Sequence, residues 1–192
     1  MVQNAQGIDG AVSRDTAWPP SIPRCGRLSQ RPAVPADNDF LLALFADSRP
    51  DLALLPEAVR ASLIHLQFQS QSSQYRSAAP DAVDWILELE SEGRPEPVGR
   101  CYLHQGLAEH HLLDLAIRPD RRGQGLGGAV LERLCADAAR AGVPLRLSVW
   151  HANQDAIRFY RRHGFVADGA ESPTDGEVAG YLRLRWPAEA TR

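Results

Sequence analysis

The clearest chemical signal in the chain is a segment rich in glycine and arginine, which reads RPDRRGQGLGG over residues 118–128. It lies between an expected strand over residues 110–118 and an expected helix that ends near Gly142. Glycine lets the backbone come close to a ligand, and the free amides at a helix N-terminus attract anions. The segment therefore predicts a phosphate or pyrophosphate site, and the alternative is a turn that only packs a helix on a sheet.

Two familiar phosphate loops fit this segment poorly. A Walker A loop needs a lysine after its last glycine, whereas Ala129 follows Gly128. Gly123, Gly125 and Gly128 match the G-x-G-x-x-G pattern of dinucleotide-binding folds. That pattern also expects a glycine at the strand end, an acidic residue on the next strand and enough chain for a doubly wound sheet, and this sequence does not supply them.

A third pattern, R-x-x-G-x-G, is formed by Arg122, Gly125 and Gly127. A second motif follows it, with the form N-x-x-A-x-x-F-Y-x-x-x-G-F. Its residues are Asn153, Ala156, Phe159, Tyr160, Gly164 and Phe165. With these two motifs in order, the chain resembles the GNAT superfamily of acyl-CoA-dependent N-acyltransferases, from about residue 27 to residue 187.

The resemblance implies a mixed α/β (α+β) fold, in which a central twisted mixed sheet of about seven strands is flanked by about four helices. We expect one N-acetyltransferase domain over residues 27–187. Residues 1–26 are expected to form a flexible extension, because their proline and small polar residues show no periodicity, and residues 188–192 are expected to form a C-terminal tail.

The resemblance also implies acetyl-CoA as co-substrate and three regions that contact it. Backbone amides would hold the pyrophosphate at Arg122, Gly123, Gln124, Gly125, Leu126, Gly127 and Gly128. A strand edge would pair with the pantetheine arm at Leu115, Ala116 and Ile117. Asn153 would contact the cofactor near the splayed strand ends while also acting as a helix N-cap.

Tyr160 would stand near the thioester sulfur as a general acid. Acyl transfer to an amine expels a thiolate whose thiol has a reference pKa of about 8.5, and a phenol near 10 can donate a proton as that charge develops. Neutralising an alkylammonium at pH 7 costs roughly 4.6 kcal/mol, whereas positioning both reactants can contribute about 7–11 kcal/mol. The alternative to this catalytic role is that Tyr160 is an aromatic core residue that packs beside Ile157.

Asp114 is the candidate base because it lies on the strand that precedes the glycine loop, and it would act through water. Otherwise it is a structural residue hydrogen-bonded to loop amides. Glu109, His110 and His111 lie just upstream. The two histidines do not predict a metal site, because adjacent strand residues point to opposite faces.

Other charged and sulfur-containing residues have ordinary alternatives. Five arginines near the loop and the next helix could attract the charged end of CoA or simply be solvated: Arg121, Arg122, Arg158, Arg161 and Arg162. Cys101 and Cys135 fall on apolar faces, so we expect buried packing residues rather than nucleophiles.

The remaining pattern supplies the elements that position these groups. An edge strand is expected over residues 27–34, followed by a helix that Asp37 or Asn38 caps and a second helix over residues 56–75 with Val59, Leu63 and Leu66 on one stripe. Three strands over residues 82–88, 98–104 and 110–118 should form an antiparallel meander, with a turn at residues 93–97.

After the glycine loop, further elements are expected from periodicity and turn signals. The helix there should bury Leu126, Val130, Leu134 and Ala138. A strand should bury Leu145, Leu147 and Val149. A short helix should run from Asn153 to a left-handed Gly164, before strands over residues 165–167 and 181–186.

Composition excludes several other classes. The 192 residues have a net charge of −3, which argues against nucleic acid as a partner. All 21 basic residues are arginine, so lysine Schiff-base chemistry is excluded. No apolar run is long enough for a membrane span, residues 1–26 lack a signal-peptide core, and Cys25, Cys101 and Cys135 form no disulfide framework. We expect a cytoplasmic protein without a membrane partner or metal.

Three functions remain after these exclusions. The first is transfer of an acetyl group from acetyl-CoA to a small-molecule or peptide amine by direct attack in a ternary complex. The second is a non-catalytic acyl-CoA-binding or sensing module, and the third is a nucleotide-binding oxidoreductase fragment. Residues 40–75 and 168–180 should shape the acceptor site, and exposed sheet edges would allow a homodimer.

Overall fold

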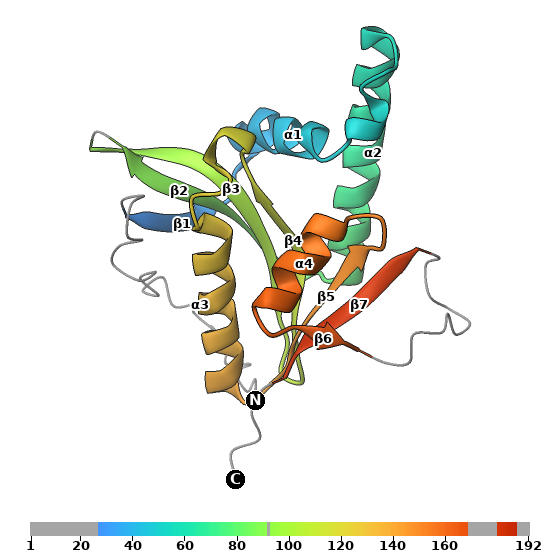
Figure 1. The fold of residues 1–192 in the computed structure, drawn as a ribbon. Helices are drawn as coiled ribbons and strands as arrows, with labels where there is room; N and C mark the ends of the chain where they lie inside the picture. The colour runs from blue at the N-terminus through green and yellow to red at the C-terminus, as the bar shows by residue number, and fades with distance from the viewer. Residues whose placement is uncertain (1–26, 92, 169–179, 188–192) are drawn as a thin grey trace, which may run out of the picture.

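The computed structural model describes residues 27–91, 93–168 and 180–187, so the predicted extension and tail lie outside it. Within these residues a seven-stranded sheet has the order β1-β2-β3-β4-β5-β7-β6 (Figure 1). The strands are β1 (Leu28–Pro32), β2 (Val83–Ser91), β3 (Arg94–Gln105), β4 (His110–Ile117), β5 (Leu145–Trp150), β6 (Val166–Ala167) and β7 (Tyr181–Trp186). The helices are α1 (Asn38–Asp47), α2 (Glu57–Ala78), α3 (Leu126–Ala141) and α4 (Gln154–Arg162). This architecture confirms the predicted fold class.

The predicted antiparallel meander is formed by β2, β3 and β4, but β3 begins earlier than expected. Residues 94–97, predicted as a turn, belong to β3, and Pro97 pairs with Glu88 of β2. β4 pairs with β3 only from Gly99 onward, so Pro95 and Pro97 lie where β3 has a free edge. Proline is tolerated there because it has no N–H to donate to a neighbouring strand.

One face of the sheet packs against α3 and α4 and contains the larger core. The predicted inward residues of α3 are all buried: Leu126, Val130, Leu134 and Ala138. Those of β5 are buried as well: Leu145, Leu147 and Val149. α3 ends at Gly142, whose φ of 68° is left-handed, as expected for a helix C-cap.

The opposite face of the first half of the sheet is covered by α1 and α2 (Figure 1). Leu41 and Phe68 from these helices pack there on Ile86 of β2. Asp37 precedes α1 but does not cap it with its side chain, which corrects the prediction. Its carboxylate instead accepts hydrogen bonds from Arg31 at 2.7 and 2.8 Å, and these lower the pKa of Asp37 to about 2.

The predicted stripe of α2 is wrong. Val59 and Leu66 are 48% and 63% exposed, Leu63 is only half-buried, and Ile64 and Phe68 face the core instead. Both sets have helical spacing, so the period alone did not show which side of the helix meets the sheet. Neither α2, with 22 residues, nor another helix in the described part of the chain is long and apolar enough to cross a membrane.

The sheet divides between β4 and β5. Parallel pairing joins residues 110–112 to residues 145–147 and then stops, although β4 continues to Ile117 and β5 to Trp150. The pairing of β3 with β4 shifts register at Leu113, and such a bulge bends a strand. We call the space between the diverging ends the β4–β5 opening, and Figure 1 shows α3 and α4 beginning beside it.

Candidate active site

The glycine loop forms an uncapped helix N-terminus at the end of β4. Gly123 and Gly125 have left-handed φ angles of 73° and 86°. A Cβ atom added at either position would meet nothing within 4 Å. The N-cap residue of α3 is Gly125, which has no side chain to cap the first turn. The unpaired amides there are thus left for a ligand, and both the helix dipole and the amide protons favour an anion.

Gly127 and Gly128 have a different role, although the sequence groups them with the same loop. Both lie within α3. A Cβ atom at Gly127 would lie 3.4 Å from Cζ of Phe159, and one at Gly128 would lie 3.1 Å from Nε2 of His163. These glycines therefore let the start of α3 approach α4 closely.

The arginines of the loop are held by the protein itself. Arg118 and Arg121 each bond to Glu96 of β3, at 2.7 Å in both cases. Arg122 donates from Nε to the carbonyl oxygen of Ile117 at 2.8 Å. Glu96 was not predicted, because it lies far away in sequence. These contacts fix the path of the loop. The amides of Arg121 and Arg122 also donate to carbonyl oxygens within it, so a ligand would meet the amides nearer the start of α3.

The edge of β4 beside the β4–β5 opening carries the residues predicted to bind an extended arm. Leu115 and Ile117 pair with Cys101 and Gly99 of β3 on one side. On the other side the pairing with β5 has already ended. Backbone groups of this segment are therefore available to a ligand that adds to the strand edge, as an extended chain does in β-augmentation.

Asp114 lies on β4 directly after the bulge and opposite Tyr102 of β3. Nη1 of Arg100 donates to it at 3.2 Å, and the same guanidinium holds Asp84 with two bonds of 2.7 and 2.8 Å. Burial raises the pKa of Asp114, and Arg100 opposes that shift. Its side-chain partner is thus Arg100, an ion pair that the sequence did not predict.

Tyr160 extends from α4 into the same region. Its ring lies 5.3 Å from that of Phe159 and 5.6 Å from that of Phe165, so it is partly a core residue. Burial raises its pKa, and the charge of Asp114 adds to the shift. The phenol is therefore fully protonated near neutral pH and is suited to donate a hydrogen bond.

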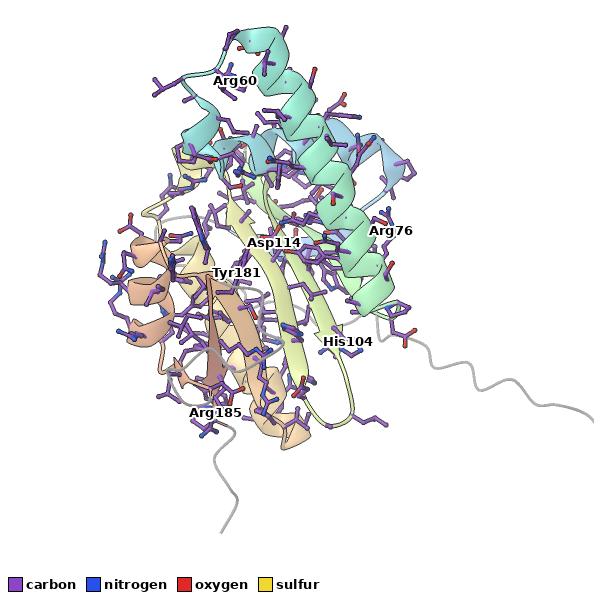
Figure 2. All side chains as sticks on the ribbon, turned by 90° about the vertical axis from the view of Figure 1, so that its right-hand side faces the viewer. Arg60, Arg76, His104, Asp114, Tyr181 and Arg185 are labelled. Atoms are coloured by element: carbon purple, nitrogen blue, oxygen red, sulfur yellow. The ribbon has the colours of Figure 1, made fainter. Side chains whose placement is uncertain are left out.

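Tyr75 of α2 was not predicted to belong to the site. Burial and the charge of Asp114 raise its pKa, and its ring meets that of Tyr102 edge-on at 5.4 Å. Figure 2 places Asp114 on β4 between α2 and Tyr181 of β7. Asp114 thus lies near tyrosines of three elements, namely Tyr75 of α2, Tyr102 of β3 and Tyr160 of α4.

The profile of the acetyltransferase (GNAT) family matches residues 52–165. This range contains the uncapped start of α3, the free edge of β4, Asp114 and Tyr160. The chain belongs to the acetyltransferase (GNAT) family. It is accordingly an acyltransferase.

Individual relatives agree with this membership. The chain is 31% identical to the peptidyl-lysine N-acetyltransferase YjaB of Salmonella typhimurium over 109 residues, which cover 56% of this chain and 68% of that protein. It is 31% identical to the thialysine N-epsilon-acetyltransferase of Bos taurus over 108 residues, which cover 50% of this chain and 59% of that protein. The crystal structure of an acetyltransferase from Thermus thermophilus superposes with a TM-score of 0.58 at 26% identity, covering 83% and 96% of the two chains.

Asn153 of this acetyltransferase caps α4, as predicted, since its Oδ1 accepts from the amide of Ala156 at 3.1 Å. Gly164 follows α4 with the expected left-handed φ, 86°. Arg158 bonds to Asp155 on the exposed face of α4, so it does not reach toward the loop. Most of the predicted acceptor segment over residues 168–180 lies outside the described residues.

The remaining candidates are packing residues of the acetyltransferase. Cys101 and Cys135 are buried, as predicted, and burial raises the pKa of Cys135 to about 12. His110 is buried and His111 half-buried, and burial lowers the pKa of both. Across the part of the chain that the structure describes, no three His, Cys, Asp or Glu residues are grouped to hold a metal ion.

Proposed function

We propose that this acetyltransferase moves the acetyl group of acetyl-CoA to a primary amine by direct attack in a ternary complex. The observation that carries the proposal is the continuity of three features. The uncapped start of α3 leads to the free edge of β4, and that edge leads to Asp114 and Tyr160. An anion site, a strand edge for an extended arm and two titratable groups thus follow one path.

The backbone binds and orients the co-substrate. Amides of residues 123–128 hold the pyrophosphate, while that of Arg122, which was also expected to do so, already donates to the carbonyl oxygen of Pro119. The space at Gly123 and Gly125 admits the anion without a steric clash. Residues 115–117 pair with the pantetheine arm along the edge of β4. When bound, acetyl-CoA supplies an acyl group on a thioester with a thiolate as leaving group. Holding two reactants in this way can contribute about 7–11 kcal/mol.

Tyr160 donates a hydrogen bond to the departing sulfur. Burial keeps its phenol protonated. The same burial would raise the pKa of a thiol in the site, since desolvation disfavours the charged form of any acid. The rise in the pKa of the thiol therefore offsets the rise in the pKa of Tyr160.

Asp114 accepts the proton of the incoming ammonium, through water. Its raised pKa makes it a better base than an exposed aspartate. Arg100 holds the carboxylate in place and, through its bonds to Asp84, is itself kept in position. The acceptor is a lysine-like alkylamine in this proposal, because the relatives named above are called a peptidyl-lysine and a thialysine acetyltransferase.

The test is calorimetric titration with acetyl-CoA, with NADH as the control ligand, followed by measurement of CoA thiol release with lysine peptides and free thialysine. The proposal expects binding of acetyl-CoA alone and amine-dependent thiol release. The chain contains no lysine, so it has no lysine side chain that could become acetylated. Acetylation of the protein itself would therefore not be mistaken for turnover of the added amine. Binding without turnover would favour the sensing module, and preference for NADH would contradict the assignment of the loop.

A further inference from the structure

A second cavity lies on the α1–α2 face of the sheet. Its volume is about 540 Å³, within the range of about 300–1,000 Å³ that small-molecule sites occupy. Its walls come from the segment after β1 and from α1, α2, β2 and β3. The described lining residues include none from β4 or β5, so this cavity is distinct from the β4–β5 opening.

Asp114 does not line the cavity, but Arg100, which donates to Asp114 at 3.2 Å, does. Phe68, Ser72 and Arg76 line the cavity from one side of this helix. Tyr75, on a neighbouring side, contacts the ring of Tyr102 and closes the space between helix and sheet. In Figure 2 Arg76 and Asp114 accordingly lie on opposite sides of α2.

The wall of the cavity contains two cations, Arg76 and Arg100, and one carboxylate, Asp84. Arg76 is exposed and makes no ion pair or hydrogen bond with any residue in the described ranges. Arg100, the other cation in the wall, is buried and is already held by Asp84 and Asp114. An anion entering the cavity would therefore meet Arg76 as its free partner.

The opposite part of the wall is apolar. Leu41 and Phe68 are buried side chains that belong to the smaller core, and both are exposed to the cavity. Ser72 and Asn38 add hydrogen-bonding groups nearby. The cavity thus offers the cation Arg76, an apolar surface and neutral polar groups within the dimensions of one small molecule, while both oxygens of Asp84, its one carboxylate, are bonded to Arg100.

We propose that this cavity binds a small organic carboxylate that also carries an apolar group. Arg76 receives the carboxylate, and Leu41 and Phe68 pack against the apolar group. Such a ligand needs no amine, so its binding does not depend on acetyl transfer, although Leu41, Phe68 and Ser72 belong to the segment over residues 40–75 that was expected to shape the acceptor site. A bound ligand would also lie next to Arg100, which holds Asp114.

Two probes of equal shape test this proposal, namely N-acetyl-L-phenylalanine and its amide, N-acetyl-L-phenylalaninamide. Neither contains a free amine, so neither can be acetylated as an acceptor. The full chain without acetyl-CoA is titrated with each probe by calorimetry. We expect saturable binding of the carboxylate at one site, about fivefold or more tighter than that of the amide, as a partly exposed ion pair would give.

Variants on α2 locate the binding. Arg76→Gln should reduce the affinity for the carboxylate to that for the amide. Arg60→Gln is the matched control, because Arg60 is on the same helix, pairs with Glu57 and does not line the cavity. Ser72→Trp should fill the cavity and weaken both probes, with folding of each variant checked by thermal melting.

Three outcomes would overturn the proposal. The first is the absence of saturable binding to the wild-type protein, and the second is equal affinity for the carboxylate and the amide. The third is an equal loss of affinity for the carboxylate in Arg60→Gln and Arg76→Gln. That result would mean that the probe responds to the overall positive charge of α2 and not to a bond with Arg76. Because the assay contains no acetyl-CoA, each outcome can be distinguished from a failure of the proposed acetyl transfer.

Discussion

The two helices that begin beside the β4–β5 opening have opposite kinds of N-terminus. α4 is capped by its own chain, since Asn153 accepts from the amide of Ala156, and Asp155 adds a negative charge to the first turn. α3 begins at Gly125 with neither a side-chain cap nor an acidic residue in its first turn. Every helix leaves about four amides without a partner inside the helix. α4 satisfies such an amide itself, whereas the first turn of α3 lacks such a cap, and we propose that its amides bind an external anion.

The surrounding residues strengthen this contrast. Glu96 on β3 holds both Arg118 and Arg121, and the amides of Arg121 and Arg122 donate within the loop, so the path of the loop before α3 is fixed by the protein itself. A site that is fixed before its ligand arrives loses less entropy on binding. The start of α3 is thus organised for binding, and the start of α4 for local stability.

The largest expected effect is on the α3 side of the comparison. Gly125→Val should weaken acetyl-CoA binding by about 100-fold or more, because side-chain bulk and a shifted backbone would remove charge-assisted hydrogen bonds worth about 1.5–3 kcal/mol each. Gly142→Val is the matched control, because Gly142 ends the same helix with φ of 68° and open space around it. Both variants should lose similar thermal stability in melting curves. Equal affinity of the two variants for acetyl-CoA in calorimetry would refute the loop assignment.

The next largest effect is on kcat and concerns Tyr160 at the β4–β5 opening. Tyr160→Phe should lower kcat by about 100-fold, with little change in the Kd for acetyl-CoA, because only the transition state needs the donor. Thiol release measured at saturating amine gives kcat, and calorimetry gives Kd. Full turnover by this variant would leave Tyr160 as a packing residue between Phe159 and Phe165.

Substitution of Asp114 should cause a smaller loss of kcat and should also change how kcat depends on pH. A base works only when ionised, so kcat should rise with pH through the pKa of Asp114, and burial places that pKa above the usual value of about 3.9. Asp114→Asn should lower kcat by about 10- to 100-fold and abolish this acidic limb of the profile. A variant that retains the acidic limb would assign it to another group, with Asp114 reduced to a partner of Arg100.

The smallest effect is on the α4 side. Asn153→Ala removes a helix cap and should cost about 1 kcal/mol in the free energy of unfolding, measured by urea denaturation. If Asn153 also contacts the cofactor, the Kd for acetyl-CoA should rise by a few-fold. A loss of affinity as large as that of Gly125→Val, without a loss of stability, would contradict the contrast between the two helix starts.

Features that depend on neighbouring residues were predictable from the sequence. Glycine at a left-handed position, a capping asparagine and alternating strand residues act within a few positions of each other, so the start of α3, the cap of α4 and the buried side of β5 were identified correctly. The family resemblance placed Tyr160 and Asp114 in one site, and the fold brings both to the β4–β5 opening.

Features that depend on contacts between distant segments were not predictable. The guanidinium of Arg100 joins Asp84 to Asp114 across three strands, and nothing in the spacing of these residues indicates it. The inward side of α2 was assigned wrongly because two apolar stripes had the same period. Pro95 and Pro97 resembled a turn, but the absence of a neighbouring strand on one side of β3 lets them extend it.

Backbone amide NMR during an acetyl-CoA titration tests the central claim most directly. The account predicts saturating shifts that are largest for the amides of residues 123–128, with smaller shifts for Gln154 and Asp155 at the start of α4. Saturating binding that leaves the amides of residues 123–128 unmoved would contradict it, because the uncapped N-terminus of α3 would then not be the anion site.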